Sequence, residues 1–490
     1  MALLQLIKHA TIPLLLAILS ACTVGPNYVR SKVETPPSYK EVEGWKKAEP
    51  QDSIPRGSWW TIYNDQQLNA LEEKVNISNQ NLAAAEAQYR QALALVQVAR
   101  AAYFPTVAAG PNASRSRTSA HAPGSQGLSS TSSDYLLSAQ VSWQPDLWGK
   151  VRRQVESNKA SAQASDADLE GVRLSMHGLL AQDYFQLRTL DSQKQLLTTT
   201  VDNYKKFLEL TKHRYATGVA AQSDVLTAQT QLETAEAQLI DTGVQRAQME
   251  HAIAVLMGKA PSDLTIPATP LDLTPPAVPA GIPSELLERR PDIASAERQA
   301  AAANALIGVA EAAYYPTVTL SATGGFEAST LAQWFLWPSR FWTLGPAAVQ
   351  ETLFDGGLRR AQTEQARAAY DASVATYRQT VLTGFQQVED SLAALRILEQ
   401  EAKSADAAAD SAKKNVIITT NQYKVGTASA LDVIVTQAIA LNDALTAVNV
   451  LGRRFNADVL LVEALGGGWS TADLASDKFV GQKQYKGFPW

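Results

Sequence analysis

The residue with the most distinctive chemistry is Cys22, the only cysteine in the 490-residue chain. It ends the motif Leu19-Ser-Ala-Cys22, behind an apolar run that follows Lys8 and is too short to span a bilayer. A thiol in this place is the group that lipoprotein maturation joins to diacylglycerol through a thioether. We therefore predict that residues 1–21 are a signal peptide and that Cys22 carries a covalent lipid. A chance cysteine behind an ordinary signal peptide is the alternative.

The next residue, Thr23, indicates in which membrane the lipoprotein is placed. An aspartate there would indicate retention in the inner membrane, so threonine favours the outer membrane. Because no second cysteine exists, no disulfide can form within the chain.

Other side chains give no sign of catalysis. The histidines, at positions 9, 121, 177, 213 and 251, are scattered, and none has metal-ligand spacing with another. His213 is near Ser223 and Asp224, but the chain has no Gly-x-Ser-x-Gly motif and no phosphate-binding loop. The net charge of -5 comes without a basic block, which argues against nucleic acid as a partner. We predict that the protein is not an enzyme and has no catalytic, cofactor-binding or metal-binding residues.

Two halves of the chain carry the same landmarks in the same order. Matched order over such distances indicates two copies of one long unit, and so a pseudo-twofold fold. The paired landmarks are Ala101–Val107 with Ala312–Val318, Leu147–Gly149 with Leu353–Gly356, Tyr215–Ala220 with Tyr423–Ala428, and Asp224 with Asp432.

Long helices must position these landmarks. From Leu68 to Tyr103, the apolar positions are separated by three and four residues in alternation, which predicts one uninterrupted coiled-coil helix that Pro105 ends. Further long helical segments are expected at about 150–215 and 358–423.

Two glycines follow these long segments, Gly218 and Gly426. Glycine takes the left-handed conformation that closes a helical hairpin, so we expect a second helix to return from each turn. The returning helices should end near residues 257 and 465.

We expect four strands, at about 105–118, 135–146, 316–327 and 341–353. Apolar and polar residues alternate from Leu137 to Gln144 and from Thr317 to Thr323, which is the period-two pattern of a strand with one apolar face. Trp334, Trp337, Phe341 and Trp342 gather near the start of the last one, as aromatic girdles do at membrane interfaces. A water-soluble sandwich and an aromatic core cluster are the alternatives. After the signal peptide, no run approaches the roughly 18 uncharged apolar residues of a transmembrane helix. A mature chain that crosses a membrane would therefore do so as a barrel.

Four strands are too few for a membrane barrel, since the smallest has about eight. An open sheet edge does not persist in lipid, so the barrel must be shared among protomers. Two protomers would give eight strands around a filled interior, and three would give twelve with room for water. We predict a mainly α fold with a small β part, in which coiled-coil hairpins form a tunnel that continues the barrel.

The predicted organisation follows the chain. Seven prolines between residues 259 and 283 exclude a helix there and predict an extended connector. The expected parts are a signal peptide at 1–21, a lipid-anchored extended segment at 22–60, a first repeat at 61–258, the proline-rich linker at 259–283, a second repeat at 284–468 and a tail at 469–490.

Six motifs carry a family resemblance: Leu19–Tyr28, Trp59-Trp60, the two Ala-Ala-Tyr-(Phe/Tyr)-Pro blocks, Asp146–Gly149, Leu287–Asp292 and Leu353–Gly357. Together they resemble the TolC-like outer-membrane efflux channels, specifically the NodT-type lipoprotein branch. The resemblance covers nearly the whole mature chain. It implies a homotrimer with a twelve-stranded barrel in the outer membrane of a Gram-negative bacterium and a long helical tunnel in the periplasm. Small molecules, such as drugs or toxic compounds, would enter from a periplasmic adaptor and an inner-membrane efflux pump.

The same resemblance implies a periplasmic gate. Asp432 falls on the aspartate that forms a ring around the threefold axis, and Tyr423 on the tyrosine that holds the coils together. Three carboxylates facing a narrow lumen attract cations and lose that attraction on protonation. Val435 and Ala428 stand where some members have a second aspartate and an arginine, so we expect one ring and fewer tying contacts. A helix cap after the Gly426 turn is the alternative role for Asp432.

Two other functions remain open at this stage. The turns at Gly218 and Gly426 would be the surface that an adaptor hairpin meets. A lipid-anchored periplasmic adaptor is itself a rival reading, although adaptors have one hairpin flanked by compact β-rich domains. A type I protein-secretion channel shares the fold, and the lipoprotein branch favours small-molecule efflux through resemblance alone.

Overall fold

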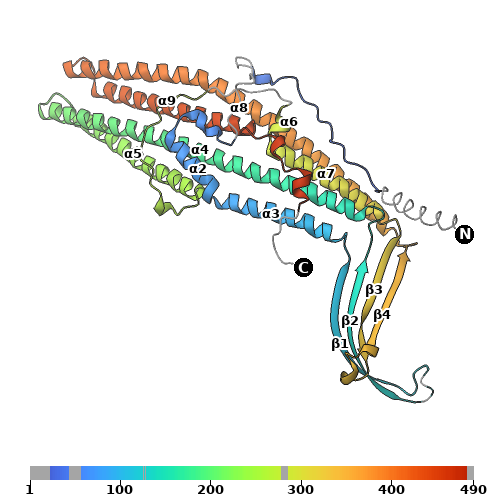
Figure 1. Cartoon of the computed structure of the whole chain (residues 1–490). Coiled ribbons are helices and arrows are strands. Elements are labelled where there is room, and N and C mark those ends of the chain that lie inside the picture. The colour runs from blue at the N-terminus through green and yellow to red at the C-terminus, as the bar shows by residue number, and fades with distance from the viewer. Residues whose placement is uncertain (1–22, 43–56, 125, 127, 277–284, 483–490) are drawn as a thin grey trace.

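A long helical body and a single sheet that projects from one end of it make up the chain (Figure 1). The computed structural model describes residues 23–42, 57–124, 126, 128–276 and 285–482. The predicted signal peptide, Cys22, and parts of the linker and tail lie outside the described residues.

Both repeats run through the same elements. The first has α2 (Gln66–Ser78), α3 (Gln80–Ala101), β1 (Thr106–Thr118), β2 (Ser130–Trp143), α4 (Lys150–Ala216) and α5 (Gln222–Leu256). The second has α6 (Leu286–Arg289), α7 (Pro291–Ala312), β3 (Thr317–Ala328), β4 (Arg340–Gln350), α8 (Leu358–Val425) and α9 (Ala430–Ala464), and α10 (Asp477–Val480) follows. The order of helix, strand, strand, long helix and returning helix confirms the internal repeat.

Equivalent aspartates shape the turn from strand to long helix in both repeats. Asp146 lies just before α4, and Arg152 lies in the first turn of that helix. The Asp146 Oδ2 atom accepts a hydrogen bond from Arg152 Nε at 3.2 Å. Asp355 pairs in the same way with Arg359 at 2.6 Å at the start of α8. Each carboxylate also accepts backbone N–H bonds from the first helical turn, which caps the helix and fixes its direction relative to the sheet.

The prediction of one uninterrupted coiled-coil helix before β1 is wrong, because α2 and α3 are separate helices. Asn79 lies between them, where its Oδ1 accepts a bond from Leu82 N at 3.0 Å and so caps α3. Its Nδ2 donates to the Leu256 carbonyl at 2.7 Å, and Ser78 Oγ donates to the Met257 carbonyl at 2.6 Å. The apolar spacing continues across the break, so only these tertiary hydrogen bonds reveal it.

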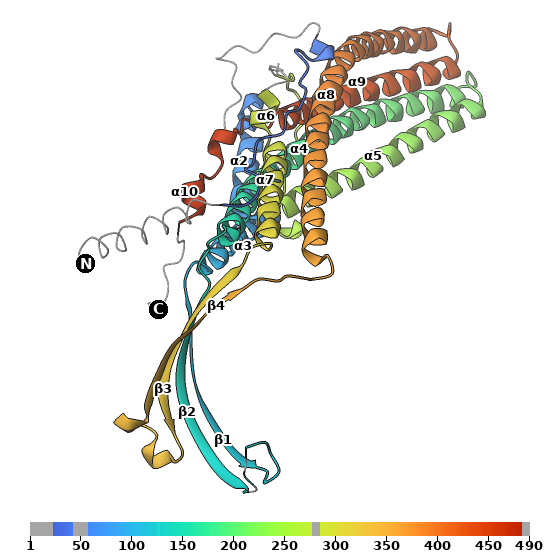
Figure 2. The same ribbon diagram turned by 90° about the vertical axis from the view of Figure 1, so that its right-hand side faces the viewer.

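The four strands form one antiparallel sheet in chain order, β1-β2-β3-β4 (Figure 2). Its register collects apolar side chains on one face: Val107 lies opposite Val141, which in turn lies opposite Ala322. Serine and threonine residues such as Thr106 and Ser142 occupy the other face. Within the described part of the chain, β1 and β4 each have one edge without a neighbouring strand.

The main core lies where the hairpins meet the first two helices. Trp59, Trp60 and Tyr63 are buried there against α4 and α9. The Phe185 ring of α4 stacks on Phe455 of α9 with centroids 4.5 Å apart, which joins the two repeats. A second apolar cluster lies near the hairpin ends and includes residues of α4, α5, α8 and α9.

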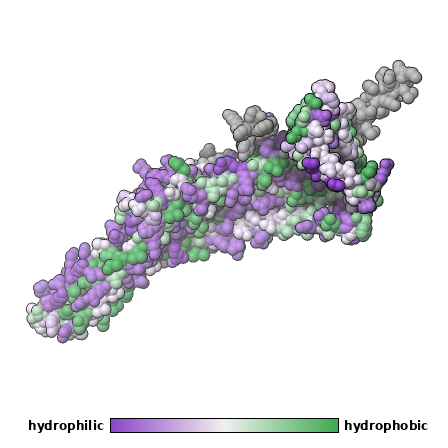
Figure 3. All heavy atoms as spheres, turned by 90° about the horizontal axis from the view of Figure 1, so that it is seen from below, coloured by the Kyte–Doolittle hydropathy of each residue, from purple (hydrophilic) through white to green (hydrophobic). Residues whose placement is uncertain are grey.

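The returning helix α9 has an apolar stretch that is largely uncovered. It is long and apolar enough to cross a membrane by length and composition, and only 17% of that stretch is buried. It lies along α8 and contacts α4 as one arm of a hairpin (Figure 1), so it belongs to the helical body. Hydrophobic patches accordingly lie among hydrophilic ones along the outside of that body (Figure 3).

Candidate gate at the hairpin tips

The turns that join the long helices lie at the end of the body opposite the sheet (Figure 1). Gly426 has φ 87° and ends α8, and its N–H donates to the Tyr423 carbonyl at 3.1 Å. Gly218 has φ 76° in the equivalent turn after α4. No other atom lies within 4 Å of where a Cβ would stand on either glycine, so the backbone angle alone requires glycine there.

Asp432 lies on the first turn of α9 and is exposed. Its Oδ2 accepts bonds from Ser429 N at 2.8 Å and from Ser429 Oγ at 2.7 Å. Ser429 Oγ in turn accepts from Asp432 N at 3.2 Å, which completes a capping box. The backbone and side-chain hydrogen bonds from Ser429 lower the pKa of Asp432, so its carboxylate is charged over a wider pH range. In a single chain, Asp432 therefore acts as a helix cap, which is the alternative role predicted for it from the sequence.

Tyr423 is buried at the last turn of α8. Its ring contacts Phe207 of α4 with centroids 5.4 Å apart. The guanidinium of Arg214 lies over the Tyr423 ring, 4.5 Å from its centre, and Arg214 Nη1 donates to the Tyr423 carbonyl at 2.7 Å. The two hairpins are thus tied together close to their turns.

The sequence did not reveal Arg214 as part of this tie. The repeat aligns Tyr215 with Tyr423, yet Tyr215 is 47% exposed and Tyr423 only 3% exposed. The pseudo-twofold relation therefore breaks at the tips, where one tyrosine faces solvent and the other the core. The absence of an arginine at position 428 was visible in the sequence, and Arg214 on the other hairpin supplies a cation near the same turn.

The chain that follows Cys22 lies at the opposite end, where helices meet sheet. Val24 N donates to the Trp148 carbonyl at 3.2 Å, and Arg153 Nε donates to the Val24 carbonyl at 3.1 Å. Arg153 also bonds the Gly25 carbonyl at 2.9 Å and Asn27 Oδ1 at 2.9 Å. These bonds fix the start of the described chain beside the strand-to-helix turn of the first repeat.

One histidine has a partner that the sequence did not suggest. His177 on α4 contacts Glu72 on α2 through Nδ1 and Oε2 at 2.6 Å, and both side chains are buried. Burial raises the pKa of Glu72 and lowers that of His177 to about 4, so desolvation disfavours the charged form of both side chains. Trp60 stacks on the imidazole with centroids 4.3 Å apart, which makes this a packed interior contact.

Paired helical hairpins joined to a sheet with one apolar face and two open edges define a class of protein, the subunits of channels that continue a membrane barrel into a helical tunnel. The outer membrane efflux protein family matches residues 71–259 and 282–467. The chain belongs to this family, whose members are ducts for efflux and not enzymes.

Individual relatives agree with this assignment. The chain is 30% identical over 460 residues to the pyoverdine export outer membrane protein OpmQ of Pseudomonas aeruginosa, covering 93% of this chain and 95% of that one. It is 27% identical over 455 residues to the toluene efflux pump outer membrane protein TtgC of Pseudomonas putida, covering 92% and 94%. The solved outer-membrane channel OprN superposes with a TM-score of 0.85 at 30% identity, covering 91% of this chain and 100% of the other. The protein is therefore an outer-membrane efflux channel protein, and the adaptor reading is not supported.

Proposed function

We propose that three copies of this chain form the outer-membrane exit duct of a tripartite efflux system, which passively conducts small molecules from a periplasmic adaptor and an inner-membrane pump. The observation that carries the proposal is the sheet, which has one apolar face and an open edge on both β1 and β4. In lipid those edges must pair, and pairing β4 of one copy with β1 of the next closes a barrel of three sheets.

The helical body supports the same assembly. The apolar window of α9 is mostly uncovered within one chain. Leu431, Val435 and Ile439 stand on successive turns of this helix and are 60%, 47% and 50% exposed. Contact with neighbouring copies around a shared axis would remove this apolar surface from water.

The gate at the tips is part of the proposal. Ser429 positions the Asp432 carboxylate at the end of the body, where three copies would bring three carboxylates near one axis. The cap and the ring are compatible, because the cap uses Oδ2 and fixes the direction of the carboxylate. Arg214 and Tyr423 would hold the hairpins of each copy in the closed arrangement.

Two membrane-related features complete the proposal. A lipid on Cys22 would enter the membrane next to the barrel, because the residues just after it are hydrogen-bonded at the junction of sheet and helices. The turns at Gly218 and Gly426 would meet the adaptor, where Val219 and Val425 are 63% and 76% exposed. A passive duct of this kind needs no cofactor.

The transported compounds are proposed to be small molecules. The relatives are named for pyoverdine, toluene and antibiotic export, and none of these is a protein. This favours small-molecule efflux over the type I secretion alternative.

The test is made on the full chain extracted in detergent. We expect a particle with three times the mass of the mature chain, which opens small cation-selective channels in a planar bilayer. A folded trimer without any openings, or a monomer that remains stable in lipid, would overturn the proposal.

A further inference from the structure

Three arginines lie on the apolar face of the sheet. On β1, Arg115 and Arg117 share the face of Val107, because side chains two residues apart point to the same side. On β4, Arg340 lies opposite Phe326, which shares that face through its pairing with Leu137. All three arginines are exposed.

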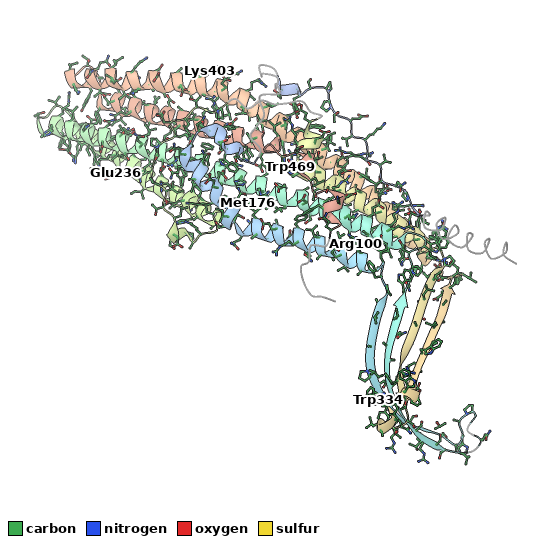
Figure 4. The ribbon with its side chains drawn as sticks, viewed as in Figure 1. Arg100, Met176, Glu236, Trp334, Lys403 and Trp469 are labelled. Carbon is green, nitrogen blue, oxygen red and sulfur yellow. The ribbon has the colours of Figure 1, made fainter. Side chains whose placement is uncertain are left out.

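Aromatic side chains gather at the same end of the sheet, far from the helices. Trp334 lies at that end (Figure 4), and its ring is 5.9 Å from that of Tyr135, between centroids. Trp337 and Trp342 are each 75% exposed, and the Arg340 guanidinium lies over the Trp337 ring. By sequence, Phe341 is grouped with these tryptophans. In the structure Phe341 lies opposite Gly325 on the other face of the sheet, so it is not part of the aromatic group on the apolar face. Exposed tryptophans on the lipid side mark the interface between acyl chains and headgroups.

Charges of opposite sign are segregated across the sheet. The acidic side chains of Asp134 and Glu327 lie on the polar face, as their pairing with Ser114 and Leu136 shows. The lipid side of the described strands thus carries arginine alone among charged residues, and the lumen side of this end carries acid. If these charges only kept the strand ends in water, both signs could stand on either face of the sheet.

The heights fit a headgroup layer. Arg115 is eight residues beyond Val107 in β1, which is about 26 Å along a strand and about 20 Å of membrane depth at a typical barrel tilt. Arg117 is two residues further along β1, on the same face and farther from the helices. Both therefore emerge at the outer rim of an apolar band that is about 25 Å tall.

The arginines retain free donors. Within the described residues, none of the three has an acidic side chain within ion-pair distance, and the Arg115 side chain has no hydrogen-bond partner. Arg117 Nη2 donates to Ser129 Oγ at 3.1 Å, and Arg340 Nε donates to the Trp337 carbonyl at 3.1 Å. Each guanidinium has further N–H groups, and its fork geometry matches phosphate oxygens.

We propose that Arg115, Arg117 and Arg340 bind the phosphate groups of the glycolipid in the outer leaflet, while the belt of Tyr135, Trp334, Trp337 and Trp342 packs against the upper parts of its acyl chains. The ligand is a phosphorylated lipid headgroup, held at the outer rim of the barrel. The inference rests on the placement of the sheet in the outer membrane and not on the compounds that the duct conducts.

The experiment compares lipids that differ only in phosphate. Purified full-length protein in detergent is titrated with bisphosphorylated lipid A or with its dephosphorylated form, and bound lipid is counted by native mass spectrometry. The wild type should prefer the phosphorylated lipid, and the triple variant Arg115→Gln, Arg117→Gln, Arg340→Gln should lose roughly 10- to 100-fold in affinity for it. The matched control is Lys205→Gln, Lys403→Gln, Arg453→Gln, which removes the same charge from exposed sites on the helical body (Figure 4 shows Lys403).

Two further measurements keep the result interpretable. Arg115→Gln alone changes an exposed side chain for which the described residues provide no hydrogen bond or ion pair, so its loss of lipid affinity does not depend on refolding. Oligomer mass and conductance are recorded on the same samples, which separates failure of the lipid site from failure of the channel. Equal binding of both lipids by the wild type, or an unchanged phosphate preference in the triple variant, would overturn the proposal.

Discussion

The Arg214 guanidinium packs on the Tyr423 ring at 4.5 Å from its centre while donating a 2.7 Å hydrogen bond to the carbonyl of the same residue. Arg214 is near the end of α4 and Tyr423 near the end of α8, so one side chain joins the two hairpins of a chain at the point farthest from the sheet. Both interactions are broken if the hairpin ends separate, so opening of the proposed gate would have to release this pair.

Replacing Arg214 should therefore loosen the closed tip. In Arg214→Gln, the loss of a cation–π contact and a charged hydrogen bond removes about 1–3 kcal/mol from the closed state. We expect single-channel openings to become several-fold more frequent in planar bilayers. Lys212→Gln is the control, because Lys212 pairs with Glu209 on the exposed surface of the same helix. Equal opening frequencies in the two variants would contradict the role of Arg214.

The charge and the cap of Asp432 can be separated by two substitutions. Asp432→Asn keeps an oxygen that accepts from Ser429 N but removes the negative charge, and it should abolish cation selectivity. Ser429→Ala keeps the charge and removes the capping hydroxyl, at a cost of about 0.5–2 kcal/mol in helix stability. It should leave the ion selectivity intact. Reversal potentials in asymmetric KCl measure this, and wild-type selectivity in Asp432→Asn would reduce the residue to a cap.

Lipidation should depend on Cys22 and not on how the following residues are held. Cys22→Ser should abolish incorporation of radioactive palmitate, since no other cysteine can accept the lipid. Arg153→Gln breaks the bonds to Val24, Gly25 and Asn27, so it should lower the unfolding temperature while palmitate incorporation continues. Label on the Cys22→Ser protein would refute lipid attachment at this residue.

Asp458 should make stability fall as pH rises. Burial raises its pKa to about 7, above the value of about 4 in an unfolded chain, so the folded state holds a proton that the unfolded state releases. The stabilisation is complete below about pH 4 and is lost as pH rises through 7. Asp458→Asn should raise the unfolding temperature at pH 8 and raise it much less at pH 5, which differential scanning fluorimetry measures.

The control for this effect is Asp410→Asn, an exposed site on α8. Tyr63 faces Asp458 in the core, and the charge of Arg454 opposes the upward shift of its pKa. An unfolding temperature of Asp458→Asn that falls equally at both pH values would show that packing, and not protonation, sets its contribution.

Periodicity and repetition made much of the fold predictable. The matched landmarks, such as Tyr215 and Tyr423, indicated two hairpins, and alternation in β2 and β3 indicated strands with one apolar face. Both follow from local patterns that a single sequence displays. The break at Asn79 could not be read in this way, because the apolar spacing of α2 and α3 continues through it and the deciding bonds go to residues 256 and 257.

In the candidate site too, local features could be predicted from the sequence and long-range contacts could not. Resemblance placed Tyr423 and Asp432, whereas Arg214 came from the structure, since its contact spans 209 positions of the chain. His177 appeared as an isolated histidine, and only folding brings Glu72 against it. Pairings at long range leave no local trace in one sequence, so pattern and resemblance together recover elements better than contacts.

Because β1 and β4 have open edges, the rate of barrel formation depends on how often copies of the chain meet. A lone subunit has no stable place in the hydrocarbon layer, so insertion and association must occur together. Attachment to a membrane surface would confine the copies to two dimensions and raise their effective concentration without any new contact between them. With Val24, Gly25 and Asn27 hydrogen-bonded beside the root of the sheet, each tethered copy would also arrive with its strands already facing the bilayer. The tether would then act chiefly on the speed of barrel formation, and once the ring is complete its removal should matter little.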